Sequence, residues 1–329
     1  PISQFIDGFS FYYIGSYKPS CDLYNGIAML CYSRDLVRKA ASCPNDHIII
    51  LSDDYDRNIR SSTYLNVMSI NTKHPMSVLA HEFGHSFVSL AEEYVPANIP
   101  RNSAGNCVAD CKDFSGKNDG CYEGCSRNDY FRSVEEGVMR TLRVDNYGSF
   151  NEWIITNKIS EVLKEDNSVI SGRAIDNERD CSKESYWLIE GKKINNDYKI
   201  NRALQRGCAG RISSGKLSYG AILGDGSEIE FGTFNSEEIF TDGPLYETND
   251  RGEEELKGIE GEVFKNIAEV HTIVPGEDGT PIEDTFEASV VDFHLKGPAV
   301  EETQTFEIKD DSGNEIVSAP IVDFSPIPS

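Results

Sequence analysis

The sequence lacks any apolar run of about 18 residues, the length that a membrane-spanning helix needs, so no transmembrane segment is expected. It also lacks an internal repeat of fixed period, which argues against a repeat architecture. The chain starts at Pro1 without a signal-peptide pattern, so we expect a processed form or a piece of a longer protein. With 329 residues, 39% of them hydrophobic, two or three domains with buried cores are expected.

Basic residues are scarce in the last third of the chain. Residues 212–329 hold 27 acidic and 6 basic side chains, which accounts for −21 of the total charge of −24. A surface of this sign repels nucleic acid and anionic lipid, and it favours solubility or cation binding. The Asp-rich turns "GEDG" and "DDSGNE" are therefore candidates for Ca²⁺, although the chain has no EF-hand loop.

Cysteine is absent beyond Cys208, whereas the chain up to that point holds nine. They are Cys21, Cys31, Cys43, Cys107, Cys111, Cys121, Cys125, Cys181 and Cys208. Their clustering in loop-like sequence predicts disulfides, and with them an extracellular or cell-surface location. The array "CVADC…CYEGC" leaves a structural zinc site as the alternative, although zinc knuckles usually have the tighter CxxC spacing. The odd count leaves one thiol free or paired outside this chain.

The first 166 residues are predicted to mix helices and strands. Strands are expected at 7–17, 47–53 and 63–71, and helices at 33–43 and 149–164. A further helix is expected with Pro75 in its first turn, and its apolar residues recur on one side as a core-facing stripe: Leu79, Phe83, Phe87 and Leu90. Residues 96–132 are too long for a plain connection, so a functional or disulfide-stapled loop is expected there.

Beyond residue 166 the signals are mostly those of β-structure. Strands with Gly/Asp turns are predicted at 184–194, 216–234, 286–295 and 304–324. Residues 199–208 are expected as a short helix and 247–258 as a charged linker. We therefore expect a β-rich module at 167–255, which Cys181 and Cys208 would staple, and an acidic β-sandwich-like module at 256–329.

The stretch "SVLAHEFGHSFVSLAEEY", from Ser77 to Tyr94, places His81 and His85 about one helical turn apart. Two imidazoles at this spacing can bind one metal ion from the same side, and Glu82 can take a proton from metal-bound water. The HExxH pattern therefore predicts a catalytic zinc site, which usually has three protein ligands and one open position. The other four histidines are expected at the surface or in packing: His47, His74, His271 and His294.

A carboxylate remains as the third ligand. On a straight helix Glu92 would stand about 10 Å above His85, at 1.5 Å per residue, and would not reach the same metal ion. The helix must therefore end and turn back soon after His85. Neither Val88 nor Ser89 is the glycine that such a turn favours.

The stretch "AHEFGHSFVSLAEEY" resembles the motif HExGHSFxxLxDEY of the IgA-peptidase family of zinc metallopeptidases, the igalysins, which are metzincin-like. "HIIILSDDY" and "CYEGCSRNDYFRSVEEGVMRTL" are similar to further segments of that family, so the resemblance covers roughly Phe9 to Leu163. It implies His81 and His85 as zinc ligands and Glu82 as the general base. It also implies Glu92, which stands where the family has Asp, as the third ligand.

Two other carboxylates, Glu93 and Glu123, match the family's pattern and remain alternatives for the third ligand. The resemblance further implies that Met139 forms the Met-turn beneath the metal. Tyr147 follows at the distance where metzincins often place a tyrosine that stabilises the oxyanion. Packing is the alternative role for Tyr147.

These features predict an α+β metzincin-like zinc peptidase domain at 1–166, with a mixed sheet and an active-site helix, followed by one or two all-β sandwich-like domains. The expected function is that of a secreted or cell-surface zinc metalloendopeptidase, with a protein or peptide substrate that pairs with the strand at 63–71. One alternative is a structural or adhesive surface protein that retains the peptidase fold and acts through its acidic β modules. The other is the same zinc chemistry on a non-peptide amide or ester.

Overall fold

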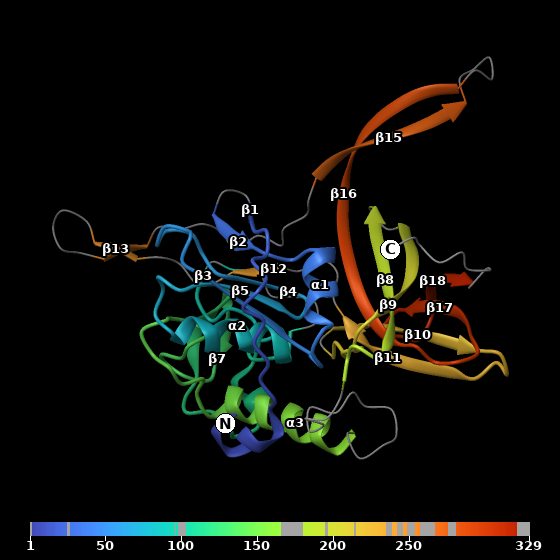
Figure 1. Cartoon of the computed structure of the whole chain (residues 1–329). Helices are drawn as coiled ribbons and strands as arrows, with labels where there is room; N and C mark the ends of the chain where they lie inside the picture. Colours follow the sequence, from blue (N-terminus) through green and yellow to red (C-terminus); the bar gives the residue numbers. More distant parts are fainter. Residues whose placement is uncertain are drawn as a thin grey trace.

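The computed structural model describes residues 2–24, 27–95, 97, 103–165, 180–194, 197–213, 215–234, 239–241, 246–248, 254–256, 267–275 and 281–320. An N-terminal part with helices around a sheet lies beside a part built from strands (Figure 1). The elements of the N-terminal part are η1 (Ile2–Gly8), β1 (Asp22–Tyr24), β2 (Ala28–Leu30), α1 (Arg34–Ala40), β3 (Ile48–Ser52), β4 (Ser62–Tyr64), β5 (Val67–Asn71), α2 (Ser77–Val88), η2 (Cys111–Phe114), β6 (Tyr122–Cys125), β7 (Arg127–Arg132) and α3 (Ser149–Glu165).

The strands that follow are β8 (Ser185–Ile194), β9 (Asp197–Arg206), β10 (Leu217–Leu223), β11 (Glu228–Phe234), β12 (Ile239–Thr241), β13 (Tyr246–Thr248), β14 (Glu254–Leu256), β15 (Ile267–Pro275), β16 (Pro281–Pro298), β17 (Thr303–Lys309) and β18 (Glu315–Pro320). The chain is thus a mixture of helices and strands in which the strands predominate. The helices expected at 33–43 and 149–164 and the strand expected at 47–53 are confirmed as α1, α3 and β3.

The central sheet of the N-terminal part has the strand order β12-β4-β5-β3, and it is mixed. β3 runs parallel to β5, whereas β4 runs antiparallel to β5. The single strand expected at 63–71 is wrong, because a tight turn at Leu65 and Asn66 splits it into β4 and β5. Leu65 takes the left-handed conformation that such a turn needs, with φ of 53°.

The strand expected at 7–17 is also wrong. Residues 9–21 are irregular after the short helix η1, and they pair with no strand among the described residues. The aromatic residues that suggested a half-buried strand stay in contact with water, since Phe11 is 73% and Tyr13 92% exposed. A residue pattern that suits a strand does not form one here, because no neighbouring strand pairs with it among the described residues.

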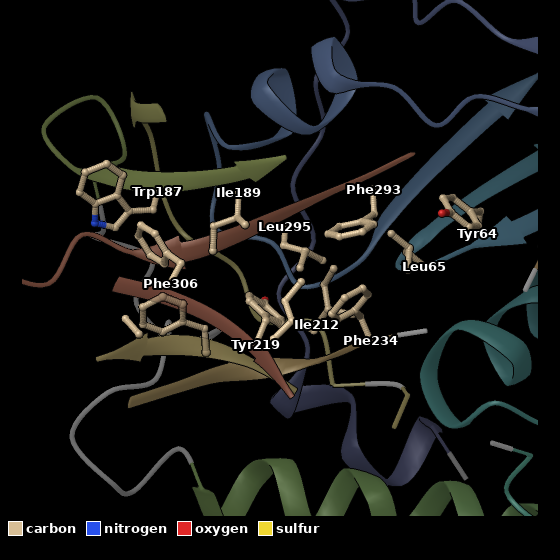
Figure 2. Packing of buried hydrophobic residues seen from close by; sticks show 13 residues of the cluster. Tyr64, Leu65, Trp187, Ile189, Ile212, Tyr219, Phe234, Phe293, Leu295 and Phe306 are labelled. Carbon is tan, nitrogen blue, oxygen red and sulfur yellow. The ribbon is translucent and has the colours of Figure 1, made fainter. Parts of the chain in front are cut away.

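Two four-stranded antiparallel sheets, β15-β16-β8-β9 and β11-β10-β17-β18, make up most of the second part. The first half of the long strand β16 pairs with β15 and the second half with β8. Side chains from both sheets meet in one apolar core (Figure 2). Its members from this part are Trp187, Ile189, Ile212, Tyr219, Ala221, Phe231, Phe234, Phe293, Leu295, Phe306 and Ile308. The arrangement is compatible with the expected all-β sandwich.

Strands on both sides of the expected boundary at 255/256 pair with each other: β8 with β16, and β10 with β17. Each of the two four-stranded sheets therefore draws strands from both 167–255 and 256–329, whereas β12 pairs with the central sheet and β13 with β14. Within the linker expected at 247–258, the described residues form parts of the short hairpin β13–β14. The helix expected at 199–208 is wrong, since these residues belong largely to β9, which pairs with β8 along its whole length.

The sandwich packs directly against the tip of the β4–β5 hairpin. Tyr64 and Leu65 are members of its core cluster, and the hydroxyl of Tyr64 donates to the carbonyl of Asp292 at 3.0 Å. A second contact joins Lys296 to Asn45, whose side-chain oxygen accepts from the Lys296 ammonium at 2.8 Å. The all-β part therefore helps to position the sheet on which the candidate site is built.

Eight of the nine cysteines are paired, as Cys21–Cys31, Cys107–Cys125, Cys111–Cys121 and Cys181–Cys208, which leaves Cys43 as a thiol. The array "CVADC…CYEGC" thus forms two nested disulfides rather than a zinc knuckle. These bridges staple the loop expected at 96–132 and are compatible with an extracellular location. Among the described residues, no helix is long and apolar enough to cross a bilayer.

Candidate metal centre

The helix α2 carries both histidines of the HEFGH stretch, and it is buried on the side that bears them. His81, Glu82 and His85 are each at most 1% exposed. Gly84, between them, lets the helix approach the chain beneath it. A Cβ at Gly84 would lie 2.8 Å from the sulfur of Met139 and 3.2 Å from the ring of Tyr147. The missing side chain at position 84 is therefore a packing requirement of the site.

The helix ends at Val88, and Ser89 supplies the turn that the sequence left without a glycine. Ser89 takes the left-handed conformation with φ of 54° and ψ of 42°. Its amide donates to the carbonyl of His85 at 3.0 Å, and the amide of Leu90 donates to the carbonyl of Gly84 at 3.1 Å. These bonds satisfy the last helical carbonyls and reverse the chain. The reversal carries Glu92 back towards the histidines.

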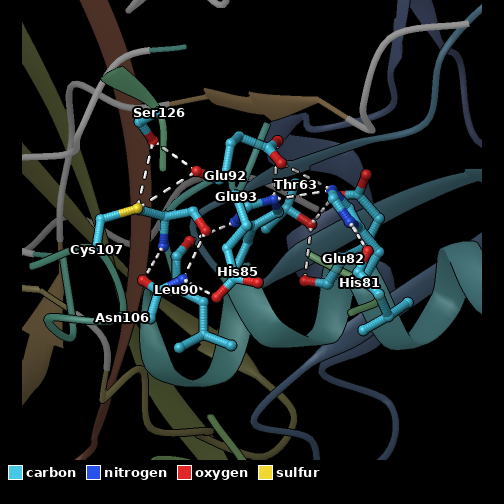
Figure 3. Close-up of polar contacts among 12 residues, drawn as sticks. Thr63, His81, Glu82, His85, Leu90, Glu92, Glu93, Asn106, Cys107 and Ser126 are labelled. Atoms are coloured by element: carbon cyan, nitrogen blue, oxygen red, sulfur yellow. Dashed lines mark hydrogen bonds and ion pairs between the residues drawn. The ribbon is translucent and has the colours of Figure 1, made fainter. Parts of the chain in front are cut away.

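The side chains of His81, His85 and Glu92 converge into one buried group (Figure 3). Each offers one ligand atom, and these atoms all lie within 4.8 Å of one another. The Nε2 atoms of His81 and His85 are 3.1 Å apart, and the His85 Nε2 atom lies 3.1 Å from Oε1 of Glu92. The His81 Nε2 atom lies 3.4 Å from Oε2 of Glu92. This group could bind a metal ion, and it is the one such group within the described part of the chain.

Backbone carbonyls hold both imidazoles by their other nitrogen. Nδ1 of His81 lies 2.8 Å from the carbonyl oxygen of Val138, and Nδ1 of His85 lies 2.6 Å from that of Leu90. A carbonyl oxygen only accepts, so each Nδ1 must carry the proton and donate it. That tautomer leaves the lone pair on Nε2, the atom that faces the centre of the group, as metal-ligating histidines require.

The electrostatics of the group show how strongly its members interact. Burial disfavours the charged form of His81, but the neighbouring Glu92 carboxylate overrides this and raises the pKa of His81 to about 10. Burial also opposes ionisation of Glu92, yet the two imidazoles lower its pKa to about 2. Burial lowers the pKa of His85. A buried carboxylate beside two imidazoles thus stabilises positive charge at this point, whether a proton or a metal ion supplies it.

Glu82 is held from the neighbouring sheet. The hydroxyl of Thr63, on β4, donates to Oε2 of Glu82 at 2.6 Å and contacts the Glu82 carbonyl oxygen at 3.2 Å. This hydrogen bond restrains the orientation of the Glu82 carboxylate, and it links α2 to β4. Thr63 was not singled out from the sequence. Its signal, a small hydroxyl residue in a buried strand ahead of the HEFGH helix, is too common to be specific.

The other two carboxylates considered as third ligand do not join the group. Glu93 is fully buried, and its Oε1 accepts from the side-chain amides of Asn151 at 2.8 Å and Asn106 at 3.2 Å. Burial raises the pKa of Glu93 to about 7, against these hydrogen bonds. Glu123, on β6, is exposed. Of the three candidate carboxylates, Glu92 is therefore the one that the structure brings to the histidines. It is also the one that the resemblance implied as third ligand.

The segment that carries Glu92 is fixed by residues that the sequence did not reveal. The side chain of Asn106 bonds both the amide and the carbonyl of Ala91, at 2.7 and 2.9 Å. The hydroxyl of Ser126 donates to the carbonyl of Glu92 at 2.6 Å. Asn106 and Ser126 each stand next to a cysteine of the Cys107–Cys125 disulfide. The bridge therefore clamps the two contacts that hold the turn.

Met139 and Tyr147 lie beneath the helix. Met139 is fully buried against Gly84, and its carbonyl accepts from the amide of Glu93 at 2.9 Å. Met139 thus packs against the site from below, and its role as a Met-turn stays a prediction. The hydroxyl of Tyr147 donates to the carbonyl of Ala80 within α2, and burial raises its pKa. For Tyr147 the contact with Ala80 favours the packing role over the oxyanion role.

The remaining candidates lie elsewhere. His47 is packed beside Phe83 and Phe87 with Nδ1 2.8 Å from the Ser86 hydroxyl, and burial lowers its pKa to about 4. His74 is buried and the ring of His294 stacks on Tyr32, whereas the side chain of His271 lies outside the described residues. In the "DDSGNE" turn, Asp310 accepts from the backbone and side chain of Asn314, so the turn itself uses this carboxylate. The "GEDG" turn lies outside the described residues.

Comparison with known proteins identifies no family: no protein-family model, no curated protein and no solved structure matches the chain. The resemblance to the IgA-peptidase family therefore depends on the motifs alone.

Proposed function

We propose that the chain is a secreted or cell-surface zinc metalloendopeptidase. The observation that supports this most is the convergence of His81, His85 and Glu92, which lie on opposite sides of a helix end, into one buried group of metal-ligand type. Two buried histidines and a carboxylate are a ligand set found in catalytic zinc sites. The four disulfides fit an oxidising, extracellular environment.

The spacing of the nearest ligand atoms is compatible with zinc. Tetrahedral coordination with Zn–N and Zn–O distances of about 2.0–2.1 Å places ligand atoms roughly 3.3–3.4 Å from each other. Here the Nε2 atoms of His81 and His85 are 3.1 Å apart. The distance to Glu92 is 3.1 Å from His85, to Oε1, and 3.4 Å from His81, to Oε2. Imidazole and carboxylate groups are common ligands of Zn²⁺. Three protein ligands leave the fourth coordination position open for water.

Glu82 would act as the general base. When bound, zinc lowers the pKa of its water ligand and polarises the scissile carbonyl. Glu82 would accept the proton of that water and pass it to the leaving amine. The Thr63 hydroxyl, at 2.6 Å, would keep the carboxylate in one orientation during this transfer.

The test is cleavage of casein or a peptide library by the zinc-loaded chain, with Glu82→Gln as the matched variant. The amide keeps the size of the side chain but cannot accept the proton. We expect kcat/KM to fall by about 10²–10⁴-fold, the usual contribution of a general base, while bound zinc stays unchanged. Equal cleavage by the two proteins would contradict the proposal. Zinc binding without any cleavage would favour a surface protein that retains a peptidase-type site.

A further inference from the structure

The strand β4 is not a free edge of the central sheet. β12 pairs with it antiparallel, with Ile239 opposite Tyr64, Phe240 opposite Thr63 and Thr241 opposite Ser62. β4 pairs with β5 on its other side, so β12 is what closes the sheet at this end (Figure 1). β12 follows β4 by about 175 residues in the sequence. It comes soon after β11, a strand of the sandwich.

The position of β12 places it at the candidate site. Phe240 lies opposite Thr63, the residue whose hydroxyl donates to the Glu82 carboxylate at 2.6 Å. β12 also comes within 8 Å, between Cα atoms, of the helix α2 that carries His81 and His85. A strand edge beside a catalytic group is where an extended peptide adds by main-chain hydrogen bonds. The backbone of β12 makes that type of addition within one chain.

We propose that Ile239–Thr241 is an intramolecular occupant of the peptide-binding edge, which keeps the site closed until a substrate or partner displaces it. This inference rests on the proposed peptidase function. The pairing on β4 uses the backbone groups that an extended substrate would need, so β12 and substrate cannot both be bound there. Activity then depends on the fraction of molecules in which β12 has left the edge.

The length of β12 makes it a displaceable occupant. It has three residues, against about five or six in a common strand. A ladder this short offers few hydrogen bonds, and a longer extended peptide can replace all of them. If about 90% of the molecules are closed, opening the edge raises kcat/KM for a peptide about tenfold.

The experiment removes the pairing with the double substitution Ile239→Pro/Phe240→Pro. Neighbouring residues of an antiparallel strand alternate between hydrogen-bonded and non-hydrogen-bonded positions. Proline has no backbone N–H group. Two adjacent prolines therefore remove at least one N–H that donates to β4, whichever of the two residues holds the hydrogen-bonded position. The matched control is Tyr246→Pro/Glu247→Pro in β13, which pairs with β14 and not with the central sheet. Each protein is made with Glu82 and with Glu82→Gln, and all are loaded with zinc.

Two readouts are compared: amide hydrogen exchange at Ser62–Tyr64 and kcat/KM on the peptide library. We expect the β12 variant to exchange faster at β4 and to cleave about tenfold better, with Glu82→Gln abolishing the gain and the β13 control equal to wild type. Unchanged exchange at β4 would overturn the inference, because the pairing would not exist in solution. Equal cleavage by an active wild type and the β12 variant would also overturn it and leave the peptidase function standing. Absence of cleavage by every zinc-loaded protein would count against the peptidase function itself.

Discussion

Glu92 and Glu93 are neighbours in sequence with opposite electrostatic environments. Two imidazoles lower the pKa of Glu92 to about 2, although burial opposes this. Burial raises the pKa of Glu93 to about 7, and among the described residues its Oε1 accepts hydrogen bonds from two neutral amides, those of Asn151 and Asn106. The first carboxylate belongs to the candidate metal centre, and the second anchors a loop and α3 to the turn. Their roles are therefore separable by experiment.

Glu93 should make stability depend on pH. The folded chain keeps a proton on Glu93 between the ordinary pKa of 4.5 and about 7, whereas the unfolded chain has lost it. Stability from this group is thus fully present below pH 4.5 and falls as pH rises through 7. Glu93→Gln keeps the acceptor for both amides without the charge. We compare the free energy of unfolding of wild type with that of the variant. We expect the difference, wild type minus variant, to fall by on the order of 3 kcal/mol between pH 4.5 and about 7.

The measurement is urea unfolding of both proteins between pH 4.5 and 7.5, with a chelator present so that metal loading does not differ. Titrating groups that do not interact with Glu93 cancel in the difference between the two proteins. A difference that stays constant across the range would show that Glu93 is ionised in the folded chain at acidic pH.

At the level of single residues, the sequence predicted the part of the site that spacing determines. His81 and His85 share a helix face because of their separation, and the reach of Glu92 followed once the helix was required to end. The geometry that separates Glu92 from Glu93 depends on side chains far along the chain, such as Asn151. The same holds for Thr63, whose bond to Glu82 requires the strand and helix to be packed first.

Among the elements, the end of α2 determines whether Glu92 can reach the histidines. A non-glycine residue in the left-handed conformation costs roughly 1–2 kcal/mol, and Ser89 adopts it at φ of 54°. The turn forms because Asn106 and Ser126 bind the segment that follows. The Cys107–Cys125 bridge holds these two contacts together. Tertiary contacts thus impose a turn that the local sequence does not favour.

Ser89→Gly should therefore stabilise the chain and Ser89→Val should destabilise it. Glycine relieves the left-handed strain, partly offset by its greater freedom when unfolded, so we expect a gain of about 0.5–1 kcal/mol. A β-branched residue is least suited to this conformation, and a loss of roughly 1–3 kcal/mol is expected. Urea midpoints of the three proteins provide the measurement. A destabilising effect of glycine would contradict the role given to this turn.

The strand β9 shows why one element was misassigned. Ile200, Ala203 and Leu204 are spaced as on a helix face, which favoured a short helix at 199–208. Pairing with β8 over ten residue positions outweighs that local preference. In the strand, Ala203 is buried and Leu204 is 49% exposed. The hairpins β10–β11 and β17–β18 were predictable because their turns are encoded locally, by Gly and Asp.

At the scale of the whole molecule, the sandwich and the central sheet are not independent. The sandwich core includes Tyr64 and Leu65 from the β4–β5 hairpin, and β12 adds to the same strand. These contacts join segments more than 100 residues apart, so no local pattern in the sequence can predict them. The interleaving of 167–255 with 256–329 in the two sheets escaped prediction for the same reason.

The central claim is that one zinc ion binds to His81, His85 and Glu92. The most direct test is the zinc content per chain, by elemental mass spectrometry after dialysis at limiting zinc, for wild type, Glu92→Gln and Glu93→Gln. We expect about one zinc per chain in wild type and Glu93→Gln. Glu92→Gln should lose at least about tenfold in affinity, since loss of even an outer partner costs 10–100-fold. Equal zinc content in Glu92→Gln and wild type would contradict the account.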